Sequence, residues 1–302
     1  MSKQEVILCE KLESSLASAI GNCPHDKLFI LTDEHTHRLC LPQLNDIPAL
    51  KEATEIIIGA EDVHKNLETL ASVWQALSEQ GATRHSLLIN LGGGMVTDLG
   101  GFAASTFKRG IAYINIPTTL LAQVDSSVGG KVAVDLEHGK NLAGAFWQPR
   151  LVLMDPEVLD ILPLPVFMEG MAEVVKYGCI RDAAFFDFLA ARPSRAELMA
   201  EMEHILYTCC AIKRSVVEQD ERDTGERMLL NFGHTLGHAY ELAGGYETWS
   251  HGQAVAAGMC AAAELGVKLG VTPAEVPARL KETLAALDKY RRASKTDKED
   301  EV

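Results

Sequence analysis

The sequence lacks the features that mark secreted, membrane-spanning or nucleic-acid-binding proteins. It contains no run of about 18 apolar residues, and its start, Met-Ser-Lys-Gln-Glu-Val, is not a basic segment followed by an apolar one. The seven cysteines are scattered without any Cys-x-x-Cys spacing, so neither a disulfide framework nor a zinc ribbon is indicated. A net charge of −14 argues against general binding of nucleic acids or anionic membranes. These absences predict a cytoplasmic protein.

The composition, by contrast, is that of a well-packed globular protein. The 302 residues are enough for two domains. A hydrophobic content of 47% supports buried cores, and a charged content of 23% is not that of a disordered chain. The sequence shows no internal repeat and no low-complexity segment.

The first half of the chain alternates short apolar runs with segments of helical spacing. Buried strands are predicted at 27–32, 55–58, 86–91 and 111–116, and helices at 64–80 and 95–108. This alternation is typical of a parallel sheet with crossover helices, so we expect an α/β domain over residues 1–155.

From about Pro156 onward, helical periodicity dominates and no convincing strand is found. Helices are predicted at 166–191, 195–221, 226–243 and 252–270. We therefore expect an all-α domain over residues 156–287. The segment 288–302 is almost wholly polar, and we expect it to be mobile.

A glycine-rich turn, Gly92-Gly93-Gly94, follows the predicted strand at 86–91 and precedes a helix rich in small residues. Glycines at such a junction let the backbone approach a phosphate, which the free N–H groups of the helix N-terminus favour. Many strand-to-helix turns carry glycine only for its conformational freedom, so this alternative stays open. The turn also departs from Gly-x-Gly-x-x-Gly, because Thr97 stands at the third glycine.

Polar loops with lysines follow the next predicted strand. They contain Pro117-Thr118-Thr119, the segment 125–131 ending in Gly-Gly-Lys131, and Gly139-Lys140-Asn141. Such loops at the carboxyl ends of strands favour the binding of anions. The alternative is a solvated hairpin with ordinary surface lysines.

Three of the ten histidines lie close together in the second half. His234 and His238 are four residues apart and project from one face of a helix, and His251 follows a Gly-Gly break. Arg227 and Asn231 are expected on or near the same helix face. Such a pair of histidines is more often a surface or hydrogen-bonded pair, but the apolar surroundings and the number of polar groups favour a buried metal or ligand site.

Glu173 and Lys176 form the second notable pair of the helical half. They are three residues apart on one face of a predicted helix, among apolar neighbours. An exposed pair of this kind is common and contributes only tenths of a kcal/mol. The apolar surroundings instead favour a buried functional pair.

Several motifs together resemble those of the 3-dehydroquinate synthase family of sugar-phosphate cyclases. The resemblance covers roughly residues 55 to 270 and rests on the segments 92–110 (Gly-Gly-Gly-Met-Val-Thr-Asp-Leu-Gly-Gly-Phe-Ala-Ala-Ser-Thr-Phe-Lys-Arg-Gly), 117–131, 139–142, 172–178 (Ala-Glu-Val-Val-Lys-Tyr-Gly), 231–239 (Asn-Phe-Gly-His-Thr-Leu-Gly-His-Ala) and 251–259. It implies an N-terminal α/β NAD-binding domain and a C-terminal all-α metal-binding domain, as in this family and in group III alcohol dehydrogenases.

The resemblance also implies the cofactors and their sites. Glu173, His234 and His251 match the ligands of a divalent metal, zinc or cobalt. The residues that match the NAD+ site are Ala60, Glu61, Asp62, Val63, His64, Lys65, Gly94, Met95, Val96, Thr97, Asp98, Thr118, Thr119, Lys131, Lys140, Val158, Leu159, Asp160 and Ile161. The residues that match the substrate pocket are Lys131, Asn141, Lys176, Lys213, Arg227, Asn231 and His238, and Arg109 resembles an arginine that reaches a neighbouring subunit in a homodimer.

The implied activity is that of a lyase in the shikimate pathway of aromatic amino-acid biosynthesis. 3-Deoxy-D-arabino-heptulosonate 7-phosphate would be converted to 3-dehydroquinate and phosphate by transient NAD+ oxidation, phosphate elimination, reduction and intramolecular aldol closure. His238 would assist proton transfer, and the cations in this acidic chain suit a substrate with a carboxylate and a phosphate.

Three other readings stay open. The chain could be a cyclase of the valiolone or deoxy-inosose type, or a metal-dependent alcohol dehydrogenase, which would release NADH. The sequence after about Leu287 resembles only a remnant of the segment with which family members continue. A third reading is therefore a homologue that binds NAD and metal with impaired activity. Thr97 and Gln253 are smaller departures from the family pattern, where glycine and glutamate are commoner.

Overall fold

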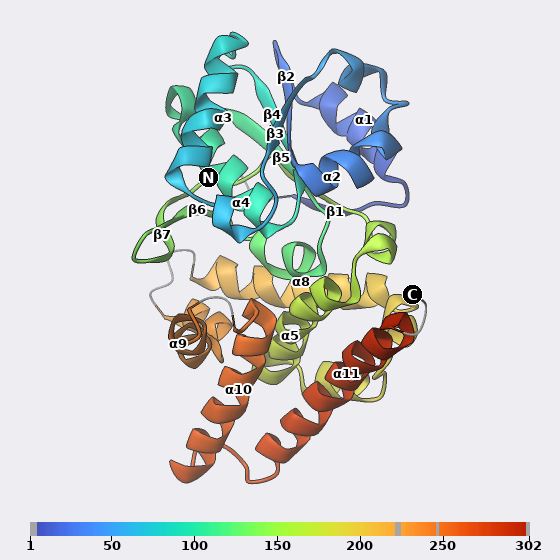
Figure 1. Ribbon diagram of the computed structural model, residues 1–302, viewed down its shortest axis with the longest axis vertical. Helices are drawn as coiled ribbons and strands as arrows, with labels where there is room; N and C mark the ends of the chain where they lie inside the picture. Colours follow the sequence, from blue (N-terminus) through green and yellow to red (C-terminus); the bar gives the residue numbers. More distant parts are fainter. Residues whose placement is uncertain (1–4, 221–224, 246–247, 300–302) are drawn as a thin grey trace. The chain divides into compact units, whose positions relative to one another are not determined.

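The computed structural model describes residues 5–220, 225–245 and 248–299, with side chains as far as Leu287. The chain divides into two compact units, Met1–Ile161 and Leu162–Val302, which are named unit 1 and unit 2 below. Figure 1 shows strands in the first and helices throughout the second. Among the described residues, no helix has both the length and the apolar character needed to cross a membrane.

Unit 1 is built on a parallel six-stranded sheet with the order β1-β8-β5-β4-β2-β3. Its strands are β1 (Val6–Leu8), β2 (Leu28–Asp33), β3 (Thr54–Ile58), β4 (Leu87–Gly92), β5 (Ala112–Pro117) and β8 (Leu151–Met154). The four predicted strands are confirmed as β2 to β5. Strands β1 and β8 were missed because runs of three and four residues carry too little periodic signal.

The strand order reverses direction between β2 and β4: β3 lies on one side of β2, whereas β4, β5 and β8 follow one another on the other side. The connecting helices therefore lie on opposite faces of the sheet, since parallel crossovers keep one hand. Helices α1 (Leu12–Asn22) and α2 (Glu34–Leu39) cover one face, and α3 (Leu67–Glu79) and α4 (Gly94–Thr106) cover the other (Figure 1). Helix α3 buries Leu70, Val73 and Leu77, which recur at helical spacing, against the sheet.

Short helical segments fill the connections of unit 1. They are η1 (Leu41–Leu44), η2 (Pro48–Glu52), η3 (Asp62–His64), η4 (Phe107–Arg109), η5 (Ala122–Ser126) and η6 (Glu157–Ile161). The segment η6 follows β8 directly and belongs to unit 1. The division between the units therefore falls after Ile161, whereas the domain boundary expected from the sequence lies at residue 155, just after the last strand.

A two-stranded antiparallel hairpin lies outside the main sheet of unit 1. It consists of β6 (Lys131–Leu136) and β7 (Gly139–Phe146), so the lysine-rich region is a hairpin, as one of the two sequence readings proposed. Strand β6 packs closely on α4, because a Cβ atom on Gly101 would lie 2.4 Å from Val132 Cγ1. The small residues of α4 therefore serve this close approach.

Unit 2 consists of helices in the part of the chain that the structure describes. They are α5 (Leu164–Arg181), α6 (Ala183–Ala190), α7 (Arg195–Met199), α8 (Met202–Gln219), η7 (Glu226–Asn231), α9 (His234–Ala243), α10 (His251–Lys268) and α11 (Val276–Glu299). Helix α5 packs against α6, α8, α10 and α11, which places its middle in the core of the unit. The backbone of α11 continues through most of the polar segment from residue 288, whose expected mobility stays a prediction.

Three details of the predicted helices were wrong. The helix expected over 195–221 is two helices, α7 and α8, which are separated by a turn at residues 200–201. The helix expected over 166–191 breaks at Asp182, whose carboxylate caps α6 by accepting from the Phe185 N–H. The helix expected over 226–243 breaks at Gly233, which has a φ of 83°. Arg227 and Asn231 therefore lie on the separate 3-10 helix η7, not on the helix of the two histidines.

Glycines allow α9 and α10 to pack unusually closely. A Cβ atom on Gly258 would lie 2.0 Å from the Gly233 carbonyl oxygen, and one on Gly237 would lie 3.1 Å from the Ala254 carbonyl oxygen. Both approaches are to backbone, which cannot move aside as a side chain can. The spacing of these two helices therefore depends on glycine.

Candidate functional site

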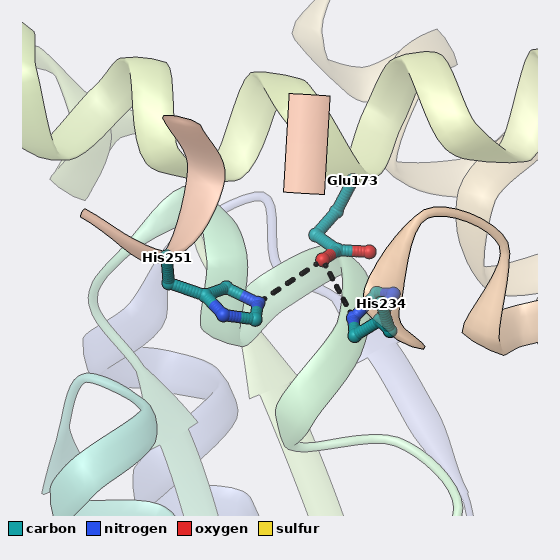
Figure 2. Close-up of side chains that lie close together, drawn as sticks. All are labelled: Glu173, His234 and His251. Carbon is teal, nitrogen blue, oxygen red and sulfur yellow. Dashed lines mark hydrogen bonds and ion pairs between the residues drawn. The ribbon is translucent and has the colours of Figure 1, made fainter. Parts of the chain in front are cut away.

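Three side chains of unit 2 form a compact cluster. Glu173 comes from the middle of α5, His234 is the first residue of α9, and His251 is the first residue of α10. The Glu173 Oε1 atom lies 3.2 Å from His234 Nε2 and 3.3 Å from His251 Nε2. Figure 2 shows both imidazole rings pointing at this one carboxylate oxygen.

Local sequence fixes where each histidine stands. The left-handed turn at Gly233 ends the preceding segment, so that α9 begins at His234. The Gln253 side chain accepts a hydrogen bond from the Ser250 backbone N–H and so caps the start of α10 at His251. The Glu169 carboxylate on α5 accepts a hydrogen bond from the Gly252 N–H and so ties the start of α10 to the helix of Glu173.

The carboxylate of Glu173 is fully buried, and the Lys176 ammonium forms an ion pair with it from one turn further along α5. Burial alone would raise the pKa of Glu173. The Lys176 ammonium and the hydrogen bonds from the two imidazoles outweigh burial and hold this pKa well below its ordinary value. Glu173 is therefore ionised at neutral pH, and the buried functional pair expected from the sequence is confirmed as a buried pair.

The imidazole of His251 lies between two carboxylates. Its Nε2 atom faces Glu173, and its Nδ1 atom lies 3.6 Å from Glu241 Oε1. Burial disfavours the charged ring, but both carboxylates favour it more strongly and raise the pKa of His251 to about 10. Without a metal, the ring thus carries a proton at neutral pH.

The donor set of this cluster fits a divalent transition metal. Glu173, His234 and His251 each offer a ligand atom, and these atoms lie within 4.8 Å of one another. One carboxylate and two imidazoles are ligands that zinc and cobalt accept, with positions left for water or substrate. Because a nitrogen of each imidazole points at the same buried carboxylate oxygen, one cation could bind all three residues.

The other unit 2 residues predicted for the site differ in exposure. Lys176, Lys213 and Arg227 are buried, whereas Asn231 and His238 are exposed. The His238 ring centroid lies 5.6 Å from that of His234 and 6.3 Å from that of His251, so the three imidazoles are neighbours.

The residues predicted to bind NAD+ all lie in unit 1, and all of them except Lys131 and Lys140 of the hairpin follow the carboxyl ends of parallel strands. Residues 60–65 follow β3, residues 94–98 follow β4, residues 118–119 follow β5, and residues 158–161 follow β8. The carboxyl ends of parallel strands share one edge of a sheet, which is where sheets of this type bind nucleotides. The turn at Gly94 lies beside the reversal of strand order, and α4 begins there.

A hydrogen-bonded network joins three of these segments. The buried Lys65 ammonium donates to Asp98 Oδ2 and to Asn141 Oδ1, each at 2.6 Å. The Asn141 backbone N–H donates to Asp135 Oδ1 at 2.7 Å, although Asn141 has a φ of 58°. At the edge of this network, Lys140 Nζ lies 3.4 Å from Asp62 Oδ2. Residues 60–65, 94–98 and 140–141 are therefore brought together.

The remaining predicted residues of unit 1 are placed as follows. Thr97 is buried and its hydroxyl donates to the Gly94 carbonyl, so this departure from glycine fits within α4. Lys131 is exposed at the start of β6. Arg109 is exposed and has a φ of 67°, next to Lys108 at 51°. Val158 and Leu159 are buried, whereas Asp160 and Ile161 are exposed.

Two carboxylates beside the metal-ligand cluster carry no prediction from the sequence. Glu241 is almost fully buried in α9, and Glu169 caps α10. Each had a signal in its spacing, because Glu241 is three residues after His238, and Glu169 is four residues before Glu173 on one helix face.

The chain matches models of one protein family over most of its length. Residues 55–169 match the model described as 3-dehydroquinate synthase N-terminal, and residues 170–300 match the one described as 3-dehydroquinate synthase C-terminal. The chain is 50% identical over 266 residues to a 3-dehydroquinate synthase of Clostridium beijerinckii. The aligned region covers 85% of this chain and 74% of that protein.

Solved structures with the same fold include two sugar-phosphate cyclases. A 2-epi-5-epi-valiolone synthase from Streptomyces hygroscopicus with NAD+ and Zn2+ bound has a TM-score of 0.86 and 26% identity, covering 95% of this chain and 81% of that one. A 2-deoxy-scyllo-inosose synthase complexed with carbaglucose-6-phosphate, NAD+ and Co2+ has a TM-score of 0.83 and 28% identity, covering 94% and 78%. With the two family models matching residues 55–300, the chain belongs to the 3-dehydroquinate synthase family.

Proposed function

We propose that this chain converts 3-deoxy-D-arabino-heptulosonate 7-phosphate to 3-dehydroquinate and phosphate. The observation that carries the proposal is the buried Glu173 carboxylate, which faces two imidazoles and the Lys176 ammonium in one cluster. The 50% identity to a 3-dehydroquinate synthase supports this substrate over those of the cyclases that are 26% and 28% identical.

Two groups bound to this chain would supply chemistry that side chains lack. A divalent cation held by Glu173, His234 and His251 would provide a Lewis acid for a substrate hydroxyl. NAD+ held at the carboxyl edge of the unit 1 sheet would provide a hydride acceptor that is restored within each turnover.

The buried cations of unit 2 suit an anionic substrate. Lys176, Lys213 and Arg227 are each at most 6% exposed, in a chain of net charge −14. Cationic side chains bind anionic groups, and the proposed substrate carries a carboxylate and a phosphate. Arginine can pair with either group through two parallel hydrogen bonds, whereas lysine acts as a point charge.

We expect His238 to assist proton transfer. Its side chain is 59% exposed, and its Nε2 atom lies 4.0 Å from Glu241 Oε2, next to the two ligand imidazoles. An exposed imidazole exchanges protons with water readily near neutral pH. We expect His238→Asn to lower kcat by about 10²- to 10⁴-fold, the usual range for a lost general acid or base, while His85→Asn, a change at an exposed histidine of unit 1, leaves kcat unchanged.

The test of the proposal is the release of inorganic phosphate from 3-deoxy-D-arabino-heptulosonate 7-phosphate. The assay would contain catalytic NAD+ and zinc or cobalt, and would be repeated after chelation. Metal-dependent release without accumulating NADH is the expected result. Release only from another phosphorylated sugar would identify a different cyclase, and stoichiometric NADH would identify a dehydrogenase. Binding of NAD and metal without any release would identify an inactive homologue.

The cytoplasmic location and the homodimer are part of the same proposal. The exposed Arg109, held in a left-handed backbone conformation that is rare for non-glycine residues, supports a role outside its own unit. Light scattering of the wild-type chain and of Arg109→Ala tests the dimer, and the mass of a monomer for the wild type would contradict it.

A further inference from the structure

Glu241 is a buried carboxylate to which the proposed reaction gives no role. It lies in α9, seven residues after the metal-ligand candidate His234, and only 1% of its surface is exposed. A carboxylate costs free energy to bury unless nearby groups favour its charge. The groups that face it should therefore show what it does.

Two imidazoles face the two oxygens of this carboxylate. Glu241 Oε1 lies 3.6 Å from His251 Nδ1, and Oε2 lies 4.0 Å from His238 Nε2. These separations are within ion-pair range and slightly beyond that of a direct hydrogen bond. The contact to His251 also joins α9 to the first residue of α10.

The opposite nitrogen of His251 is the one that faces the metal cluster. His251 Nε2 lies 3.3 Å from Glu173 Oε1, so the ring stands between one carboxylate on each side. A neutral imidazole carries its proton on one nitrogen only, and the partner of that nitrogen decides which. A carboxylate at Nδ1 keeps the proton there and leaves the Nε2 lone pair for a metal.

The second candidate histidine has a weaker partner. His234 Nδ1 lies 3.4 Å from the backbone carbonyl of Phe232, two residues earlier in the chain. A carbonyl can fix the tautomer of a ring, but a carboxylate also makes the ring a stronger base. The two imidazoles of the cluster are thus held by different kinds of acceptor.

We infer that Glu241 is a positioning residue, which holds His251 with its proton on Nδ1 and thereby makes Nε2 a stronger metal ligand. The inference rests on the metal centre of the proposed function and concerns only the residues of this chain. It assigns Glu241 no contact with substrate.

A purely structural role of Glu241 and a role in positioning His251 predict different results for Glu241→Leu. Removing one partner of a buried ion pair is destabilising when it leaves an uncompensated charge, but the His251 imidazole can be neutral and keeps Glu173 on its other side. Glu241→Leu should therefore keep the fold and weaken the metal site. Glu241→Gln keeps an oxygen acceptor without the charge, so its metal affinity should fall between those of the wild type and Glu241→Leu.

The experiment measures the Kd for Zn2+ by competition with a chromophoric chelator, on the full chain. Losing such a partner typically weakens metal binding by about 10- to 100-fold, which is the expectation for Glu241→Leu. Glu264→Gln is the matched control, because it removes a carboxylate from an exposed pair with Lys281 on α10 and α11. Urea unfolding with chelator present reports the stability of each metal-free variant.

The inference is overturned if both Glu241 variants bind Zn2+ within about twofold of the wild type. It is also overturned if their loss of affinity follows a matching loss of stability, or if the wild type binds a second equivalent of zinc that the variants lose, since Glu241 would then be a ligand. A wild-type chain that binds no metal would instead contradict the proposed function, so the two failures can be told apart.

Discussion

Among the described residues, each unit contains a lysine that is buried against a carboxylate, and the two pairs Lys65–Asp98 and Lys176–Glu173 are built differently. In unit 1, Lys65 and Asp98 lie 33 residues apart in sequence, meet at 2.6 Å and keep 9% and 16% of their side chains exposed. In unit 2, Lys176 and Glu173 lie three residues apart on α5, with 1% and 0% exposed.

The two pairs differ in what they connect. Lys65 joins the segment after β3 to α4, and also to Asn141 of the hairpin, so it fixes the arrangement of loops. The ion pair on α5 joins two residues of one helix, and its carboxylate also faces His234 of α9 and His251 of α10. A buried pair of this kind is weak evidence for stability, so its presence is better explained by the chemistry that the two charges serve.

The largest effect is expected from Glu173→Leu. The Lys176 ammonium would stay buried without this carboxylate, which should lower the free energy of unfolding by about 3–5 kcal/mol, and metal binding should be lost. Adding Lys176→Met should restore most of the stability but none of the metal binding. Urea unfolding measures the stability of each variant, and zinc titration measures metal binding. A Glu173→Leu protein as stable as the wild type would contradict the expected cost of leaving Lys176 without this carboxylate.

A smaller effect is expected in unit 1 from Lys65→Met. The variant loses two charge-assisted hydrogen bonds that are partly exposed to solvent, so we expect about 2–3 kcal/mol lower stability of this unit. The affinity for NAD+ should fall as residues 60–65 lose their connection to α4, whereas zinc binding by unit 2 should stay unchanged. Calorimetric titration with each ligand measures the two affinities, and a parallel loss of zinc binding would contradict the assignment.

Helix spacing provides the next test, through Gly258→Ala. The added methyl group would meet the Gly233 carbonyl oxygen, so α9 and α10 must separate, at a cost of about 1–3 kcal/mol. The zinc Kd should rise because His234 and His251 stand at the starts of these helices. Gly21→Ala is the control, since nothing lies within 4 Å of a Cβ atom there and its α1 helix should gain slightly in stability.

The smallest effect is expected on the protonation of His251. The pKa of His251 in the metal-free protein is raised to about 10, above its ordinary 6.5. Its contribution to stability is therefore fully present below about pH 6.5 and is lost as the pH rises through about 10. Zinc binding at pH 7.5 should release about one proton, because the ligand ring must be neutral. Calorimetry in buffers of different ionisation enthalpy counts that proton, and release unaltered in Glu241→Gln would contradict the role of that carboxylate in the pKa.

The sequence predicted those parts of the fold that depend on local periodicity. Strands β2 to β5 and helix α3 were found because their apolar residues recur at regular intervals. The break at Gly233 was missed, because apolar residues continue on both sides of it and only the backbone angle reveals the turn. The hairpin of β6 and β7 was left as one of two readings, since its polar residues mask the alternation.

The candidate site was predicted in a similar way. The spacing of His234, His238 and His251 indicated a metal site, and family resemblance added Glu173 as a ligand. The roles of these residues stay predictions, although the cluster itself is present. Glu241 was not predicted despite its spacing from His238, because a single glutamate in a helix looks like a surface residue until tertiary packing buries it.

The strand order of unit 1 also affects how the chain can fold. Strand β1 lies at the edge of the sheet and pairs with β8, so that Val6 stands opposite Val152. This pairing cannot form until almost the whole of unit 1 has been synthesised. Contacts so distant in sequence form slowly, because a long loop must close before they contribute. The central strands β2, β4 and β5 can assemble earlier, from segments that are closer in sequence. During synthesis, therefore, the glycine turn after β4 can form while the edge of the sheet is still open.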